Sequence, residues 1–388
     1  MLQAQSAVAR QFATPSQLLL LRAALLEGPE AVQAAEAWFA SGRTEAGPGF
    51  IRLEQGSRRL LPLVYRNVKE ALPAELRDTL RRVFLQYWAD NQKLFRRMEE
   101  RLTWFQANGI PTMALKGVAL SVLHYRDKGT RPMADFDILV PEDLARHVIG
   151  MLQRDGWSAD AYFSRAPQNK YFYRHIHGTL VTHPDHGAFD LHWHVLHAAT
   201  FPGADSAFWD DSVPLSLNTI ATRALNPTDQ LLHACVHGFT VTEVAPIRWI
   251  ADAITILRTS QMDWNRMVKL ARHLRVNIPM AATLRFLQDT FPTSIPGDVL
   301  VQLAAVPADA PDRRYFARLS TVHRSASEIL AENYERHRRA NRDTAPILRL
   351  ASLPRQFQLH YNLPRLTDLG PFAFSWLGKR IARMLGRR

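Results

Sequence analysis

Apolar residues recur at helical spacing through the first quarter of the chain. One run begins at Pro15 and Ser16 and ends at Gly28-Pro29, and residues 30–40 and 58–72 repeat the spacing. The longest run covers residues 74–108, where apolar side chains follow one side and Gly109 offers a C-cap. The pattern predicts an N-terminal helical region at residues 1–108.

Short apolar runs replace this spacing between residues 110 and 217. Strands are predicted at 110–115, 136–140, 158–163, 171–182 and 188–195, with a helix at 142–155 and a hairpin turn at 184–187. Helical spacing returns at residues 229–240, 247–258 and 264–274. We therefore expect an α+β fold, with a core at 109–220 that carries the chemistry and a C-terminal helical region at 221–388.

The composition narrows the class of protein. A chain of 388 residues with 47% hydrophobic content can bury more than one core. The single cysteine, Cys235, lies in an apolar helical stretch, which excludes an internal disulfide and indicates a buried thiol in a reducing cytoplasm. No run approaches about 18 uncharged apolar residues, so we expect no transmembrane span. The net charge of +12 favours anionic partners such as nucleotides, nucleic acid or an anionic membrane face.

Three aspartates form the strongest chemical pattern. Asp135 and Asp137 stand at alternate positions at the head of an apolar strand, so both side chains are expected on one face. Their mutual repulsion is relieved by a divalent ion that prefers oxygen ligands, as magnesium does. Asp190, on a later strand, would complete a site for two ions about 3.5–4 Å apart. Two aspartates alone are also common at the ends of surface strands, so the residues around them matter.

Those surroundings suit a phosphate. Lys116 and Gly117 form a turn between a strand and a helix, where glycine lets the backbone approach a phosphate closely. Lys116 and Arg131 add positive charge to this region.

The segments 115–120, 124–125, 129–140 and 189–193 together resemble a bacterial family of uncharacterised nucleotidyltransferases in the DNA polymerase β superfamily. The resemblance covers most of the chain from about residue 60 to 291 and implies a polymerase β-type core, a short mixed sheet with helices. It also implies transfer of a nucleoside monophosphate from an NTP such as ATP, with pyrophosphate release and two Mg²⁺ ions, Mn²⁺ being an alternative. One departure concerns the donor phosphates: the superfamily usually has Gly-Ser where this chain has Lys116-Gly117.

The predicted roles fall into three sets. The catalytic and metal-binding set is Asp135, Asp137 and Asp190, and the nucleotide-binding set is Lys116, Gly117 and Arg131. The acceptor side is assigned to His192, His233, His237 and Arg248. The acceptor itself, a small molecule, a peptide or RNA, is not specified by the sequence. Arg248 and Asp252 are also spaced for an ordinary ion pair within one helix.

Other interpretations stay open. The +12 charge suits a toxin-like enzyme that modifies tRNA. Seven histidines between residues 175 and 197 suit a metal-dependent hydrolase, although His175 and His177 also read as alternate strand positions. A catalytically silent binding module could keep the same fold. The basic C-terminus, residues 372–388, is typical of a membrane-surface or nucleic-acid contact, or of a helix that docks on the body.

Overall fold

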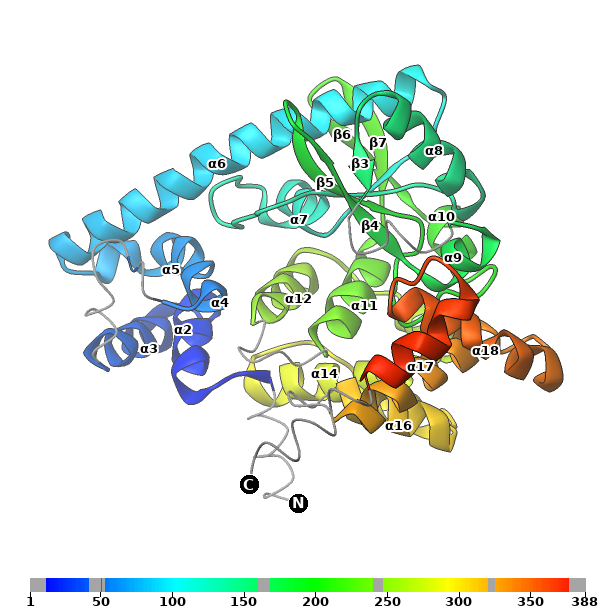
Figure 1. Cartoon of the computed structure of the whole chain (residues 1–388). Coiled ribbons are helices and arrows are strands. Elements are labelled where there is room, and N and C mark those ends of the chain that lie inside the picture. The colour runs from blue at the N-terminus through cyan, green and yellow to red at the C-terminus, as the bar shows by residue number, and fades with distance from the viewer. Residues whose placement is uncertain are drawn as a thin grey trace, which may run out of the picture. The chain divides into compact units, whose positions relative to one another are not determined.

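The computed structural model describes residues 12–41, 50, 53–159, 168–239, 247–319 and 325–376 (Figure 1). The chain forms two compact units, each made of two separate segments. The first unit comprises residues 1–139 and 205–324, and the second comprises residues 140–204 and 325–388. This grouping follows spatial contacts, and the functional division at residues 108 and 220 stays a prediction.

Helices make up the N-terminal part of the first unit. They are α2 (Pro15–Leu25), α3 (Gly28–Ala40), α4 (Gln55–Arg58), α5 (Leu61–Val68), η3 (Lys69–Ala71) and the long α6 (Ala74–Ala107). Thr14 and Gln17 form a reciprocal capping box that fixes the start of α2. The predicted helix at 74–108 is confirmed, whereas the predicted helix at 58–72 is divided among α4, α5 and η3.

A mixed sheet forms the centre of the first unit. Its strands lie in the order β2 (Asp137–Leu139), β1 (Met113–Leu115), β7 (Ile220–Ala224) and β6 (Val213–Leu217). Strand β1 runs antiparallel to β2 and parallel to β7. The prediction that the sheet ends by residue 217 was wrong, because β6 turns back into β7 at Asn218, which adopts a left-handed φ of 50°.

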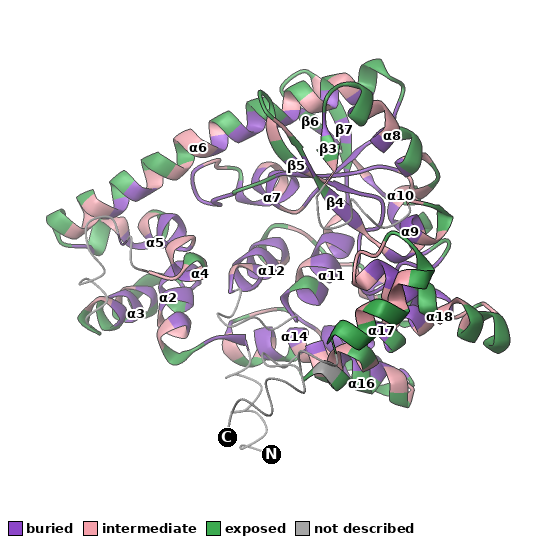
Figure 2. Ribbon diagram, viewed as in Figure 1, coloured by how far each residue is buried: buried purple, intermediate pink, exposed green. Residues whose placement is uncertain are grey.

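Helices pack beside this sheet. The strand β1 leads directly into α7 (Lys116–Leu120) and a π-helical turn, η4 (Ser121–Tyr125). After α10 (Ser206–Asp210) and the β6–β7 hairpin, the chain forms α11 (Pro227–Gly238), α12 (Arg248–Thr259), α13 (Trp264–His273), α14 (Asn277–Thr290), α15 (Gly297–Ala305) and α16 (Ala310–Leu319). Helices α11 and α12 pack against each other, and α12 contacts η4. Most of α12 is buried (Figure 2).

The second unit combines an antiparallel sheet with helices. Its elements are α8 (Glu142–Arg154), β3 (Ser158–Ala159), α9 (Lys170–His175), β4 (Gly178–His183), β5 (Gly187–His192), α17 (Ala326–Ala340), α18 (Pro346–His360) and η6 (Leu366–Asp368), with the strands in the order β3-β4-β5. The predicted strand at 171–182 was wrong in its first half, because Asn169 caps α9 there. His175 is therefore a helical residue and not a strand residue.

The part of the chain that the structure describes includes no helix that is both long and apolar enough to cross a membrane. Cys235 is a buried thiol, as predicted, and burial raises its pKa to about 12.

Candidate active site

Asp137 is the first residue of β2, and it is buried next to a cation. Its backbone pairs with Leu115 at the end of β1, which brings the following residue, Lys116, to the same edge of the sheet. The Nζ atom of Lys116 donates to Oδ1 of Asp137 at 2.5 Å. Lys116 adopts a left-handed φ of 46°, an uncommon conformation for a residue with a side chain. The sheet edge therefore holds a buried carboxylate and a lysine in direct contact.

Arg131 and Asp252 form a second ion pair, and both side chains are buried. Arg131 donates from Nε and Nη2 to the two carboxylate oxygens of Asp252, each at 2.8 Å. The hydroxyl of Tyr125 donates to the same carboxylate at 2.9 Å. Burial alone would raise the pKa of Asp252, but the charge and hydrogen bonds of Arg131 outweigh burial and lower it. Asp252 thus directs its carboxylate to Arg131 on another element, and not to Arg248 one turn away on its own helix.

Helix α6 holds the loop that carries Arg131. The side-chain amide of Asn91 donates to the carbonyl of Arg131 at 2.9 Å, and its oxygen accepts from the backbone N–H of Met133 at 3.1 Å. Asn91 is fully buried, so these hydrogen bonds fix the loop before β2 to helix α6.

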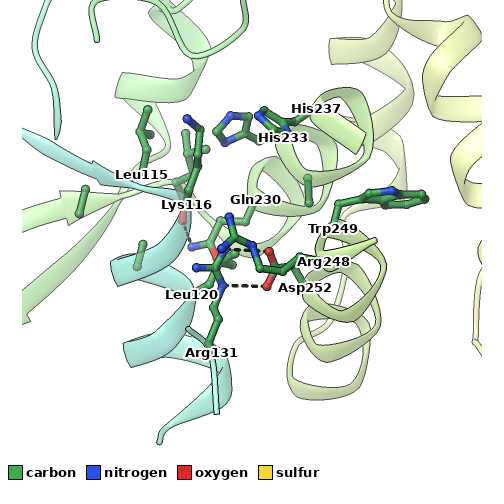
Figure 3. A pocket seen from close by; sticks show the side chains of 14 residues that line it. Leu115, Lys116, Leu120, Arg131, Gln230, His233, His237, Arg248, Trp249 and Asp252 are labelled. Atoms are coloured by element: carbon green, nitrogen blue, oxygen red, sulfur yellow. Dashed lines mark hydrogen bonds and ion pairs between the residues drawn. The ribbon is translucent and has the colours of Figure 1, made fainter. Parts of the chain in front are cut away.

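These residues line one pocket, with a volume of about 80 Å³. Its walls come from the β1–α7 segment, from Arg131, and from α11 and α12, including His233, His237 and Arg248. In the view of Figure 3, Lys116 lies near His233 and His237, and Arg131 lies near Arg248 and Asp252. The structure therefore brings together Lys116 and Arg131 from the predicted nucleotide-binding set and three residues predicted for the acceptor side. A cavity of this volume has room for a few water molecules or for one phosphate group.

Positive charge dominates the pocket. Asp252 is the one carboxylate among the lining residues, and Arg131 already pairs with it. Arg248 donates from Nη1 to the carbonyl of Pro132 at 3.1 Å. Burial lowers the pKa of Arg248 to about 10, and the neighbouring charge of Arg131 adds to this, so the guanidinium stays charged at neutral pH. The pocket is therefore lined by three permanently charged cations, Lys116, Arg131 and Arg248, and one carboxylate, Asp252.

Asp135 differs from Asp137 in its surroundings. It precedes β2, and its side chain is exposed. Its negative charge acts on Arg59, whose pKa is lowered mainly by burial, and on Arg248. Arg59 was not singled out in the sequence, because nothing in the Arg58-Arg59 pair indicates that one member faces a carboxylate 76 positions later.

Gly117 is closely packed by the protein itself. A Cβ atom at this position would lie 2.6 Å from Sδ of Met133 and 2.7 Å from Nη1 of Arg131. The glycine is therefore required for the packing of the loop before β2, in addition to the close phosphate approach that was predicted for it.

The remaining predicted site residues belong to the second unit. Asp190 and His192 stand at alternate positions of β5, with Asp190 half-buried and His192 buried. Gly178 on β4 pairs with His192, and a Cβ there would lie 2.9 Å from the imidazole Nδ1. The backbone N–H of Val140 donates to the carbonyl of His192 at 2.9 Å. This bond ties the end of β5 to the residue that directly follows β2.

Several of the histidines between residues 175 and 197 lie close to one another. The ring of His177 is 5.4 Å from that of His192 and 6.0 Å from that of His197, measured between ring centroids. His175 is hydrogen-bonded to Asn341, whereas His183 and His186 pack on Trp157. Nε2 of His194 lies 3.1 Å from the carbonyl of Tyr173.

Residues 56–292 match the model of a family described as uncharacterised nucleotidyltransferase, which is more than half of the chain. None of the curated proteins matches the chain.

Proposed function

Since the chain belongs to this nucleotidyltransferase family, we propose that it moves a nucleoside monophosphate from an NTP to an acceptor hydroxyl or phosphate and releases pyrophosphate. The observation that carries the proposal is the pairing of Asp137 with Lys116 at the mouth of a cationic pocket. A buried carboxylate suits a divalent ion, and the cations beside it suit a polyphosphate. We assign the fold of the core to the polymerase β type.

The phosphates of the donor would occupy the pocket. Lys116 and Arg248 supply positive charge there, and Arg131 presents Nη1 beside Gly117 while its other nitrogens hold Asp252. His233 and His237 line the same pocket, so we assign them to the donor phosphates and not to the acceptor. With about 80 Å³, the pocket suits the terminal phosphate, and the nucleoside would extend outside it.

The metal-binding residues in this proposal are Asp135, Asp137 and Asp190. Asp190 is included because it is a half-buried carboxylate on strand β5, within the residues that the family model matches. Bound Mg²⁺, or Mn²⁺, would neutralise the phosphates and lower the pKa of the acceptor hydroxyl.

In the reaction, the acceptor oxygen attacks the α-phosphorus and the bond from that phosphorus to the bridging oxygen breaks. Asp190 would take the proton from the acceptor, and the cations of the pocket would hold the departing pyrophosphate. The pair of Arg131 and Asp252 keeps the pocket wall in place during this step.

The direct test is incubation of the protein with each labelled NTP, magnesium and a cell extract. We expect a labelled product that chelation of the metal abolishes and that Asp137→Asn does not form. Absence of labelled product with every NTP would contradict the proposal. A labelled product that ribonuclease destroys would identify RNA as the acceptor, as in the toxin-like alternative.

The hydrolase interpretation has less support. His175 is hydrogen-bonded to Asn341, and His183 and His186 pack on each other and on Trp157, so these three histidines have contacts that account for them. Tightly bound zinc or iron in the purified protein would favour the hydrolase.

A further inference from the structure

Exposed apolar side chains concentrate in one part of the second unit. In the described residues, twelve large apolar side chains are exposed, and eight of them lie between residues 330 and 376. Figure 2 shows exposed positions along α17 and α18. Large exposed apolar patches mark sites of interaction with proteins, membranes or ligands.

Helix α18 exposes aliphatic side chains in its first two turns and buries two glutamines near its end. Ile347, Leu348 and Leu350 are 77%, 62% and 66% exposed, whereas Gln356 and Gln358 are buried. The amide of Gln358 donates to the carbonyls of Leu363 and Pro364, so the buried glutamine holds the following turn. The aliphatic residues in the first two turns of α18 therefore contribute little to the core, which leaves them available to another surface.

An apolar groove continues this exposed surface. It has a volume of about 550 Å³ and is lined by side chains of α17, α18 and residues 361–376. Leu330, Leu350 and Trp376 line the groove and are also exposed, so the groove and the aliphatic turns of α18 share residues. Phe374, next to the groove in sequence, is 81% exposed.

The same region is basic. Residues 330–376 contain seven arginines and four acidic residues, and from residue 344 onward the arginines are Arg349, Arg355 and Arg365 against one acidic residue, Asp368. The sequence of residues 377–388 adds five basic residues and no acidic one. Exposed aliphatic and aromatic side chains among cations are the combination that binds the interface of an anionic membrane. RNA would use the cations but gain nothing from Ile347 and Leu348, and a second copy would bring like charges together.

We propose that residues 346–376 form a docking surface for an anionic lipid bilayer, so that the protein binds peripherally through the second unit. The side chains of Ile347, Leu348 and Phe374 enter the headgroup boundary, and the arginines contact lipid phosphates. This proposal is independent of the nucleotidyl-transfer chemistry, since its residues lie outside the candidate active site.

The test is flotation of the full-length protein with vesicles of phosphatidylcholine alone or mixed with phosphatidylglycerol. We expect binding to the mixed vesicles only, weakened about tenfold by high salt. The double variant Ile347→Ser/Leu348→Ser should reduce binding about tenfold or more, because two apolar side chains no longer leave water. The matched control is Leu85→Ser/Trp88→Ser, which removes two exposed apolar side chains from α6 and should change binding less than roughly twofold.

Three results would overturn the proposal. They are the absence of binding to anionic vesicles, equal binding to neutral vesicles, and equal losses in the two double variants. If the protein binds tRNA but no vesicles, the basic region serves nucleic acid instead. If it binds no vesicles and the Ile347/Leu348 variant changes from dimer to monomer, the surface is covered by a second copy of the chain. Phe374→Ser provides a second, single substitution at an exposed position, and unchanged thermal melting of each variant confirms that it folds.

Discussion

The carboxylate of Asp252 accepts three hydrogen bonds, and the side chains of Asp252 and Arg131 are both buried. Asp252→Asn removes the charge and leaves the guanidinium of Arg131 buried without its counterion. We expect the free energy of unfolding to fall by about 3–5 kcal/mol, measured by urea denaturation.

Asp211→Asn is the control for this loss of charge. Asp211 pairs with Arg266, but its side chain is 59% exposed and Arg266 keeps its second partner, Asp229. This substitution should cost no more than about 1 kcal/mol. Equal losses for Asp211→Asn and Asp252→Asn would contradict the structural role of the buried pair.

His175 makes the second unit sensitive to acid. Its Nδ1–H donates to the carbonyl of Tyr171, and its Nε2 accepts from the amide of Asn341, whose nitrogen also donates to the carbonyl of His337. Burial lowers the pKa of His175 from 6.5 to about 3. The folded state therefore holds the proton more weakly than the unfolded state does, and stability is lost as the pH falls below 6.5.

We expect a loss of roughly 2 kcal/mol from this group by pH 5. His175→Gln should flatten the pH dependence of thermal unfolding between pH 7 and pH 5, while His147→Gln, at an exposed position of α8, should leave it unchanged. A pH profile that His175→Gln does not alter would show that another group is responsible.

Asp190 is proposed to act on the acceptor and not on the donor. Asp190→Asn keeps one oxygen ligand and should leave Mg–NTP affinity within a few-fold of the parent, measured by calorimetry. Its single-turnover rate with a working acceptor should fall about 10²–10⁴-fold. A rate close to that of the parent would show that another residue takes the proton from the acceptor. His192 is then examined before Asp185, because Asp185 is exposed in the β4–β5 turn.

At the scale of elements, the turn from β1 into α7 depends on Gly117. Gly117→Ala places a Cβ against Met133 and Arg131, and Asp252 holds Arg131 so that it cannot move away. We expect the free energy of unfolding to fall by about 1–3 kcal/mol. Gly150→Ala in α8 is the control, because the nearest atom to its Cβ is 3.8 Å away and alanine favours a helix interior. If the Gly117→Ala variant has the same melting temperature as the parent protein, the close packing around Gly117 is contradicted.

Long elements could be predicted from the sequence, and short ones could not. The run at 74–108 has many turns over which the apolar spacing repeats, and α6 follows it. Helix α9 has six residues, and its aromatic side chains are equally typical of a strand, so only the Asn169 cap distinguishes the two. The β6–β7 hairpin was missed because its five-residue strands contain Pro214 and Arg223 and its turn contains no glycine.

At the scale of the whole molecule, the candidate site depends on residues far apart in the sequence. The chemistry of single residues was enough to select five candidate site residues from the sequence. They line one pocket in the structure: Lys116, Arg131, His233, His237 and Arg248. Their partners could not be predicted in the same way, because Arg131 and Asp252 are 121 positions apart and Asn91 holds Arg131 from another helix. Spacing within one helix suggested a pair of Arg248 with Asp252, but the competing guanidinium of Arg131 takes both oxygens.

The contact between Lys116 and Asp137 has a consequence for the order in which ligands bind. While the ammonium occupies the carboxylate, a free metal ion must displace it, so magnesium alone should bind weakly. A polyphosphate would draw the lysine away from Asp137 and so remove this competition. Nucleotide and metal should therefore bind with positive cooperativity, by a factor of about 5–150 that is the same in both directions. Calorimetry should show that Lys116→Met binds magnesium more tightly without nucleotide and loses most of this coupling. The protein would then bind its metal ion tightly only when the nucleotide is bound as well.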